Sequence, residues 1–401
     1  MTALLEESPA RLDWTQSAEL VVDLAAALHA AGAPAHRLEA TVDAVSRSLG
    51  VRAAVFAQPT SVYLDLDGKT RMLRVEPRDV ALADLVEIDR LARRVESGET
   101  LPAQARLELA ERMAHPKTWS KVTTAAASAG TAGAAAVFFG GGALELVLSA
   151  ALSAAVGFAP ARLSALMPLT AAIGVGLIAR LASTQLPIRA DIVLLAGLIV
   201  LLPGFTLTTG LTELATRHLS SGTARLSAAA VTLLQLGVGI GLASAIAGRL
   251  GLQSLPVAAL ASPEPWTQAL ALTVAALSFL VLFRARARDL PAILGVAFLA
   301  VHATRLGGEL LGAQSAPFLG ALAVGLAANV HARLRDVPAL VLLVPGLILL
   351  VPGSLGFSGV RALVSDGGGD LLDGARMLLV GASLATGLLA ANALLPPRRA
   401  L

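Results

Sequence analysis

Two apolar stretches of the sequence contain Pro-Gly pairs with hydroxyl side chains close by. The first is residues 202–210 (LPGFTLTTG) and the second is residues 344–354 (VPGLILLVPGS). Proline removes a helical hydrogen bond and glycine lets the backbone open, so both stretches predict broken helices with free carbonyl and amide groups. Such groups can bind the carboxylate and ammonium of a small zwitterion. The expected substrate-binding residues are Pro203, Gly204, Thr206, Thr208, Thr209, Pro345, Gly346, Pro352, Gly353 and Ser354. An ordinary helix kink is the alternative, and the repeated position favours a binding site.

Ionisable residues inside the apolar part of the chain are the second group that could do chemistry. Glu145 follows three glycines, and Glu213 follows the first Pro-Gly stretch. Charges inside a membrane are costly, and a partly buried carboxylate can take up and release a proton during transport. We therefore expect Glu145 and Glu213 to couple transport to protons. Weaker candidates are Arg180, His302 and Asn329, for which snorkelling or a position at a helix end is the alternative.

A third group lies near the N-terminus. His36, Glu39 and Asp43 share one face of a predicted helix, a pattern that suits a metal ion or acid–base chemistry. A solvated helix face explains the same pattern and is favoured, since exposed polar faces are usual on amphipathic helices. The chain has no cysteine, and we find no nucleophile elbow, phosphate loop or two-histidine metal motif. No catalytic residue, metal or cofactor is therefore expected.

The elements that must position these residues fall into two regions. Of the 31 basic and 28 acidic residues, 33 lie within residues 1–121 and 26 in the rest of the chain. Only 15% of all residues are charged, against about 25% in soluble domains. A soluble domain therefore precedes a membrane domain, and the net charge of +3 is too small to indicate nucleic acid. Charged residues interrupt the start of the chain before any apolar run, so no signal peptide is expected.

The first region predicts a small α+β domain, residues 1–116, in the cytosol. Helical spacing indicates helices around residues 21–28, 38–49, 85–95 and 100–113. Alternating patterns indicate strands at residues 51–56, 62–66 and 72–75, with a hairpin turn at Asp67-Gly68.

The second region predicts about ten transmembrane helices, since a span needs about 20 apolar residues. The charge-free stretches are residues 122–144, 146–161, 163–179, 192–212, 226–248, 265–283, 290–304, 310–332, 337–360 and 377–397. Loops and ends on the expected cytoplasmic side carry twelve basic residues, and the opposite loops carry six. This excess predicts that both termini are cytoplasmic.

The membrane region also repeats itself. Leu201-Leu202-Pro203-Gly204 corresponds to Leu343-Val344-Pro345-Gly346, and Gly176-Leu177 corresponds to Gly325-Leu326. Two further pairs, in the same order, have similar offsets. Five spans per half force the second half to enter the membrane upside down, an architecture typical of transporters. The predicted halves are residues 117–250 and 251–401.

Several motifs resemble the bacterial threonine/serine exporter family. They are Gly32-Ala33-Pro34-Ala35-His36-Arg37-Leu38-Glu39, Gln58-Pro59-Thr60, Phe139-Gly140-Gly141 and Leu202-Pro203-Gly204-Phe205. The second half resembles the smaller companion module of the family, which some bacteria encode as a separate chain. The resemblance implies export of L-threonine and L-serine from the cytoplasm, driven by the proton motive force, across the bacterial inner membrane.

The sequence thus predicts a non-enzymatic secondary transporter whose partners are a small polar amino acid, protons and the lipid bilayer. An exporter of another metabolite, such as a dicarboxylate, stays open, because related two-chain systems are associated with dicarboxylates. A membrane-anchored hydrolase that uses the His36–Glu39–Asp43 face and a passive channel stay open as well. The soluble domain could instead gate the exporter or join subunits, and the sequence leaves a homo-oligomer open.

Overall fold

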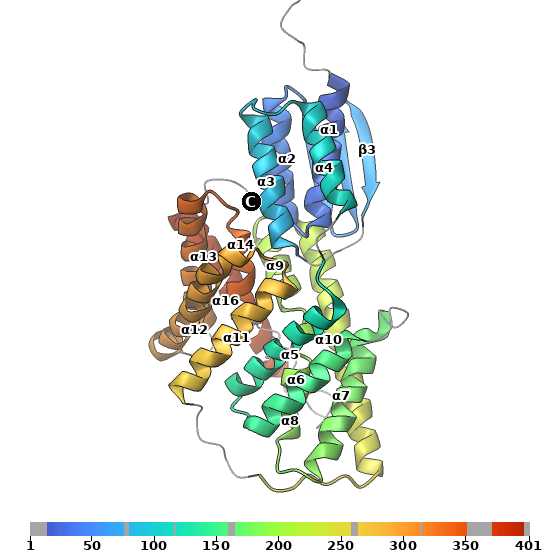
Figure 1. Ribbon diagram of the computed structural model, residues 1–401, viewed down its shortest axis with the longest axis vertical. Helices are drawn as coiled ribbons and strands as arrows, with labels where there is room; N and C mark the ends of the chain where they lie inside the picture. Colours follow the sequence, from blue (N-terminus) through green and yellow to red (C-terminus); the bar gives the residue numbers. More distant parts are fainter. Residues whose placement is uncertain are drawn as a thin grey trace, which may run out of the picture.

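A computed structural model places an α+β domain on one end of a helical domain (Figure 1). The structure describes residues 14–75, 80–115, 118–158, 165–257, 264–312, 315–350 and 371–396; for residues 371–378 it describes the backbone alone. The order of elements follows the sequence-based prediction, with soluble elements first and long apolar helices after residue 120.

The described part of the N-terminal domain comprises four helices and one small sheet. The helices are α1 (Trp14–Ala30), α2 (Ala35–Ser48), α3 (Leu82–Glu96) and α4 (Pro102–Ala114). The strands β1 (Ala53–Gln58), β2 (Ser61–Leu66) and β3 (Lys69–Arg74) form an antiparallel meander. Asp67 and Gly68 both have positive φ, which a tight two-residue hairpin turn requires, so the predicted turn is confirmed.

Only one face of this sheet is buried. Val62, Leu64 and Leu66 alternate along β2 and belong to the apolar core of the domain. The opposite face exposes Phe56 and Tyr63, which the strand register places side by side. This alternation is what an antiparallel sheet with one solvated face produces.

The helical domain contains α5 to α16. Its elements are α5 (Lys121–Phe138), α6 (Ala143–Gly157), α7 (Met167–Ser183), α8 (Ala190–Gly197), the 3-10 turn η2 (Ile199–Leu201), α9 (Gly204–Ala215), α10 (Leu219–Arg249), α11 (Pro265–Leu282), η3 (Ala287–Asp289), α12 (Leu290–Leu311), α13 (Ala316–Arg335), α14 (Leu340–Leu349) and α16 (Leu371–Leu394). Each predicted span overlaps a helix from this set.

By length and composition, four described helices could cross a membrane: α10, α11, α12 with η3, and α13. A fifth candidate is the bent pair formed by α8 and residues Ile199–Ala215. The apolar helices α6, α7 and α14 and the Leu379–Leu394 part of α16 are shorter. The structure therefore supports a multi-pass helical protein and gives fewer full-length spans, within the described residues, than the ten predicted.

Glycines let certain helices approach closely. A Cβ added at Gly239 of α10 would lie 2.6 Å from the Cβ of Ala172 on α7. A Cβ added at Gly325 of α13 would lie 2.5 Å from the Cβ of Ala391 on α16. Small residues at such crossings are typical of packing between membrane helices.

The N-terminal domain contacts the second half of the helical domain through an apolar surface. One cluster of buried residues runs from the soluble core, including Leu82 and Leu85, to Ile293, Val324 and Val341 of α12, α13 and α14. At this junction the backbone amides of Leu82 and Ala83 donate to the carbonyls of Phe283 and Arg284, at 2.9 and 3.0 Å. The first turn of α3 and the C-terminal end of α11 thereby satisfy each other's free backbone groups.

Candidate substrate and coupling site

The predicted break in the fourth apolar stretch is confirmed. Helix α8 stops at Gly197, η2 covers one turn, and α9 starts at Gly204. The segment Ile199–Ala215, which contains η2 and α9, is bent by 46° from α8. Pro203 precedes α9 and has no N–H, so it cannot continue the ladder of helical hydrogen bonds.

The threonines after this break differ in what their hydroxyls contact. The Thr208 hydroxyl donates to the Gly204 carbonyl at 3.0 Å, and the Thr212 hydroxyl donates to the Thr208 carbonyl at 2.9 Å. Thr209 is buried and Thr206 is half-buried, and neither hydroxyl has a hydrogen-bond partner among the described residues. With respect to the described residues, Thr206 and Thr209 are therefore the hydroxyls of this segment that are available to a ligand.

The second Pro-Gly segment does not form the matching break at its first pair. Pro345 lies inside α14, which continues to Leu349, so the break expected there is absent from the described helix. A Cβ added at Gly346 would lie 2.6 Å from Val324 Cγ1, so Gly346 lets α14 pack closely against α13. The other predicted members, Pro352, Gly353 and Ser354, lie outside the described residues. Helix α9 contacts both α14 and α16, so the broken helix lies where the two halves meet.

Glu145 joins three segments at the turn between α5 and α6. Its side chain accepts from the backbone N–H of Gly142 at 2.9 Å and from the backbone N–H of Arg189, just before α8, at 2.9 Å. The Arg189 guanidinium donates to the Gly140 carbonyl at 2.7 Å. The buried carboxylate thus caps α6 and fixes the start of α8 against the α5–α6 turn.

Glu213 is fully buried near the C-terminal end of α9. Its Oε1 accepts from the backbone N–H of Ala35, the first residue of α2, at 2.9 Å. Its Oε2 accepts from the Ser221 hydroxyl at 2.7 Å, and the Arg225 Nε lies 3.1 Å from both oxygens. A carboxylate at a helix N-terminus is stabilised by the helix dipole, and here the helix belongs to the soluble domain.

Histidine side chains surround this contact. The rings of His36 and His218 have centroids 5.9 Å apart, and His218 Nε2 lies 3.2 Å from Glu39 Oε2. Burial lowers the pKa of His36 to about 3, with further lowering by the nearby positive charges of Arg37 and Arg225 and by His218. His36 is therefore neutral, and its buried Nδ1 has no hydrogen-bond partner among the described residues.

Two family models match the chain, one in each part. The model described as a putative threonine/serine exporter matches residues 19–247, and the model described as threonine/serine exporter ThrE matches residues 268–394. The chain belongs to the threonine/serine exporter family. The curated proteins and the solved structures gave no match. The resemblance predicted from the sequence, with the companion module fused as the second half, is confirmed.

The weaker candidates in this exporter lie away from the break. Arg180 is exposed and lines a cavity of about 470 Å³ between α7, α8 and α10, together with Asp191. His302 is exposed, and its Nδ1 lies 2.8 Å from the Phe298 carbonyl. Asn329 is buried and donates to Asn392 Oδ1 at 2.9 Å, joining α13 to α16. The structure does not bring these three residues together.

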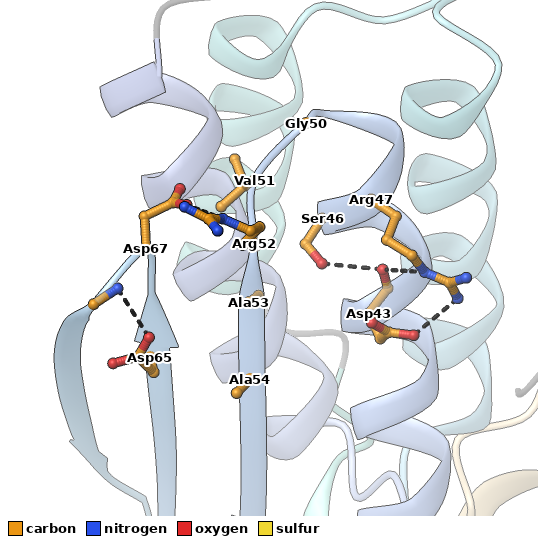
Figure 2. A pocket seen from close by; sticks show the side chains of 11 residues that line it. Asp43, Ser46, Arg47, Gly50, Val51, Arg52, Ala53, Ala54, Asp65 and Asp67 are labelled. Carbon is orange, nitrogen blue, oxygen red and sulfur yellow. Dashed lines mark hydrogen bonds and ion pairs between the residues drawn. The ribbon is translucent and has the colours of Figure 1, made fainter.

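The hydrolase hypothesis depended on the face of α2. His36 and Glu39 lie at the junction with α10, whereas Asp43 lines a cavity of about 760 Å³ at the other end of α2 (Figure 2). In that cavity Asp43 pairs with Arg47, and the Ser46 hydroxyl donates to the Asp43 carbonyl at 3.0 Å. Within the described residues no group of three histidines or carboxylates could hold a metal ion. The three residues do not converge on one reacting point.

Sequence reasoning missed the residues that hold Glu213. From the sequence, Arg225 counts only among the twelve basic residues expected on the cytoplasmic side, and Ser221 and His218 are not candidates. The sequence does contain a signal for these partners. Ser221 and Arg225 lie four residues apart, near the start of the predicted helix that follows Glu213.

Proposed function

We propose that this chain is a secondary active exporter of L-threonine and L-serine in the bacterial inner membrane, driven by the proton motive force. Both family models, in the order of the two predicted halves, support amino-acid export. In this proposal the chain crosses the membrane ten times, as two inverted halves (residues 117–250 and 251–401), with both termini in the cytoplasm.

The packing of equivalent helices supports the inverted repeat. Gly176 of α7 approaches Ala243 of α10, and Gly325 of α13 approaches Ala391 of α16. Gly176 and Gly325 are the same pair that the sequence repeat aligns. Two related halves can exchange conformations and so expose one site to each side of the membrane in turn.

Three connections on one side of the helical domain support the orientation. Residues beside the α9–α10, α11–α12 and α13–α14 connections all contact the N-terminal domain: Ser220 contacts Gln58, Phe283 contacts Leu82, and Asp336 pairs with Arg93. The same connections carry basic residues such as Arg217, Arg284 and Arg335, which the positive-inside rule assigns to the cytoplasm, so in this proposal this side faces the cytoplasm.

The broken helix is the observation that carries the substrate site. The first turn of α9 points backbone N–H groups away from the helix, which suits the carboxylate of an amino acid. Thr206 in this first turn and Thr209 in the next turn offer hydroxyls with no hydrogen-bond partner among the described residues. Pro203 and Gly204 create the break, and Thr208 contributes its oxygen as an acceptor only, because its proton is used within α9.

Proton coupling by Glu145 or Glu213 belongs to this proposal as well. Each carboxylate accepts donors from a different segment, so a bound proton would weaken a contact between elements. That is the property a coupling residue needs, because protonation must change the conformation that is favoured.

Transport into proteoliposomes tests the function. We expect threonine movement that saturates and depends on an imposed pH gradient, with competition by serine and none by dicarboxylates. Threonine movement that does not depend on the pH gradient would refute proton coupling. Competition by dicarboxylates and not by serine would indicate that the substrate is a dicarboxylate. Non-saturable flux would indicate a channel.

Variants at the break test the site. Thr206→Val and Thr209→Val each remove one free hydroxyl with little change of shape, and we expect the KM for threonine to rise about tenfold, the effect of one hydrogen bond worth about 1.4 kcal/mol. Thr223→Val is the matched control, because the Thr223 hydroxyl is exposed and donates to its own helix at 2.8 Å. An unchanged KM in both site variants would show that the substrate does not bind these hydroxyls.

The structure does not favour the hydrolase hypothesis, because His36 and Glu39 lie at the junction with α10 and Asp43 lies at the other end of α2. Cleavage of dipeptides by the purified N-terminal domain would support a hydrolase nevertheless.

A further inference from the structure

The N-terminal domain is attached to the two halves of the helical domain in different ways. Its contact with the second half is mainly apolar and continuous with the soluble core, and it also includes two backbone hydrogen bonds to Phe283 and Arg284 and an ion pair from Arg93 to the exposed Asp336. Its contact with the first half is polar. There Gln58 Nε2 lies 2.8 Å from Ser220 Oγ, and Glu39 lies 3.2 Å from His218.

The centre of the polar contact is the Glu213 clasp, which we define as Glu213, the Ala35 backbone N–H, Ser221 and Arg225. Every donor in the clasp forms a hydrogen bond with the Glu213 carboxylate, at donor–acceptor distances of 2.7 to 3.1 Å. Ser221 and Arg225 belong to the first half, as Glu213 does, so the clasp contact that crosses the junction is the one between the carboxylate and the N-terminus of α2. This contact weakens when the carboxylate loses its negative charge. The attachment to the first half is therefore weakened when Glu213 loses its charge, whereas the attachment to the second half rests mainly on apolar burial.

This difference matters for alternating access. If the halves move relative to each other, a domain attached to both must release one of them. The apolar attachment would expose a continuous core to water on release, whereas the polar one exposes groups that water can solvate. Release of the contact at α9 and α10 should therefore cost less free energy than release of the contact with the second half.

We propose that the Glu213 clasp is the cytoplasmic gate of the exporter, and that a proton on Glu213 opens it; this inference rests on the proposed function. The proton bonds to one carboxylate oxygen, which removes the negative charge that pairs with Arg225 and with the N-terminus of α2. The N-terminal domain then moves with the second half, away from α9. Once open, Glu213 faces the cytosol and releases its proton there, and the clasp can close again.

The charges around Glu213 favour this response. Positive or titratable groups come from three helices at the junction: His29 on α1, His36 and Arg37 on α2, and His218 and Arg225 at the start of α10. Glu39 is the other carboxylate, and it contacts His218 and the Ala57 backbone N–H. With Glu213 neutral, the junction keeps its cations and loses a buried anion, so repulsion favours separation.

The absence of cysteine from the chain allows a direct measurement. In full-length protein in liposomes, Gln58→Cys with Ser220→Cys places one thiol on each side of the clasp. A short bifunctional thiol reagent, added at fixed pH after brief equilibration at different pH values, should cross-link this pair several-fold less after equilibration at low pH. The matched control pair, Ala83→Cys with Arg284→Cys, spans the attachment to the second half and should cross-link equally at each pH.

The Glu213→Gln variant identifies the titrating group. Its Gln58–Ser220 cysteine pair should cross-link poorly at every pH, because the amide carries no charge. A pH dependence that persists in Glu213→Gln would assign the effect to His218 and overturn the proposal. Equal cross-linking at all pH values in the otherwise wild-type pair would overturn it as well.

Transport completes the test. Cross-linking the Gln58–Ser220 pair should reduce threonine flux at least tenfold, and reversal of a cleavable cross-link should restore it. Full flux through the locked protein would overturn the gate. The cross-linking arms need no substrate, so a pH-dependent clasp in a protein that moves no threonine would reject the proposed substrate and leave the gate standing.

Discussion

At the scale of residues, the two buried glutamates share a mode of contact. Each accepts backbone N–H groups from segments remote in the chain: Glu213 binds Ala35, 178 residues away, and Glu145 binds Arg189, 44 residues away. A single carboxylate next to an apolar segment can be recognised in a sequence, so both glutamates could be predicted as candidates. Their partners could not, because no local pattern links a glutamate to an amide in another domain.

Glu145 offers a stability prediction. Glu145→Ala leaves two backbone N–H groups without their acceptor, so we expect it to lower the free energy of unfolding by about 2–4 kcal/mol. Glu145→Gln keeps an acceptor oxygen and should cost less. Thermal unfolding in detergent compares the two variants. Equal stability of Glu145→Ala and wild type would show that this carboxylate does not hold α6 and α8 together.

His36 offers a pH prediction. Its pKa is lowered from 6.5 to about 3 in the folded protein, so the unfolded chain binds the extra proton between these values. The stability that this residue contributes is complete above pH 6.5 and is lost as the pH falls toward 3, by at most about 1.4 kcal/mol per pH unit. A His36→Gln variant should show a shallower loss of unfolding temperature across this range. An unchanged slope would mean that His36 is solvated or already charged in the folded state.

At the scale of elements, the hydrophobic pattern of the sequence predicts the helices and strands, but it predicts the helix breaks only in part. Pro203 interrupts its helix and Pro345 does not, although the two sit in repeated sequences. The difference comes from packing: neighbouring helices can stabilise a helix that contains proline, and α14 is buried between α12 and α13 with Gly346 against Val324. A single sequence does not reveal which neighbour a segment will have.

Glycines at helix crossings give a matched comparison. A Cβ at Gly325 would lie 2.5 Å from Ala391, so Gly325→Ala should overpack the α13–α16 crossing and destabilise the protein by about 1–3 kcal/mol. Gly295→Ala on α12 meets nothing within 4 Å, and should be neutral or stabilising by up to about 1 kcal/mol through helix propensity. Unfolding temperatures that move in the same direction for both variants would contradict the close crossing.

At the scale of the whole molecule, composition predicts a soluble part and a membrane part but not how they join. The charge count marks the boundary near residue 121, and the family match confirms what the membrane part belongs to. The continuous core between the soluble domain and the second half appears only in three dimensions, because Leu82 and Phe283 are 201 positions apart.

This shared core predicts the effect of removing the soluble domain. A chain that starts at residue 118 exposes the apolar surface around Phe283 and Ala285, so we expect its second half to unfold or aggregate more readily than its first half. Limited proteolysis of the truncated protein in detergent should cut α11–α14 before α7–α10. Equal protection of both halves would show that the junction contributes little to stability.

The mutual capping of α3 and α11 has a consequence for biogenesis. Leu82 and Ala83 leave the ribosome some 200 residues before the carbonyls of Phe283 and Arg284 that accept their amides. During that interval water binds the free N–H groups of the first turn of α3, and the part of the soluble core that later packs against the second half is exposed. At ordinary rates of translation the wait lasts from roughly ten to forty seconds. The domain that is synthesised first is therefore completed only after α11 has entered the bilayer, and a chaperone that shields this edge would act within that window.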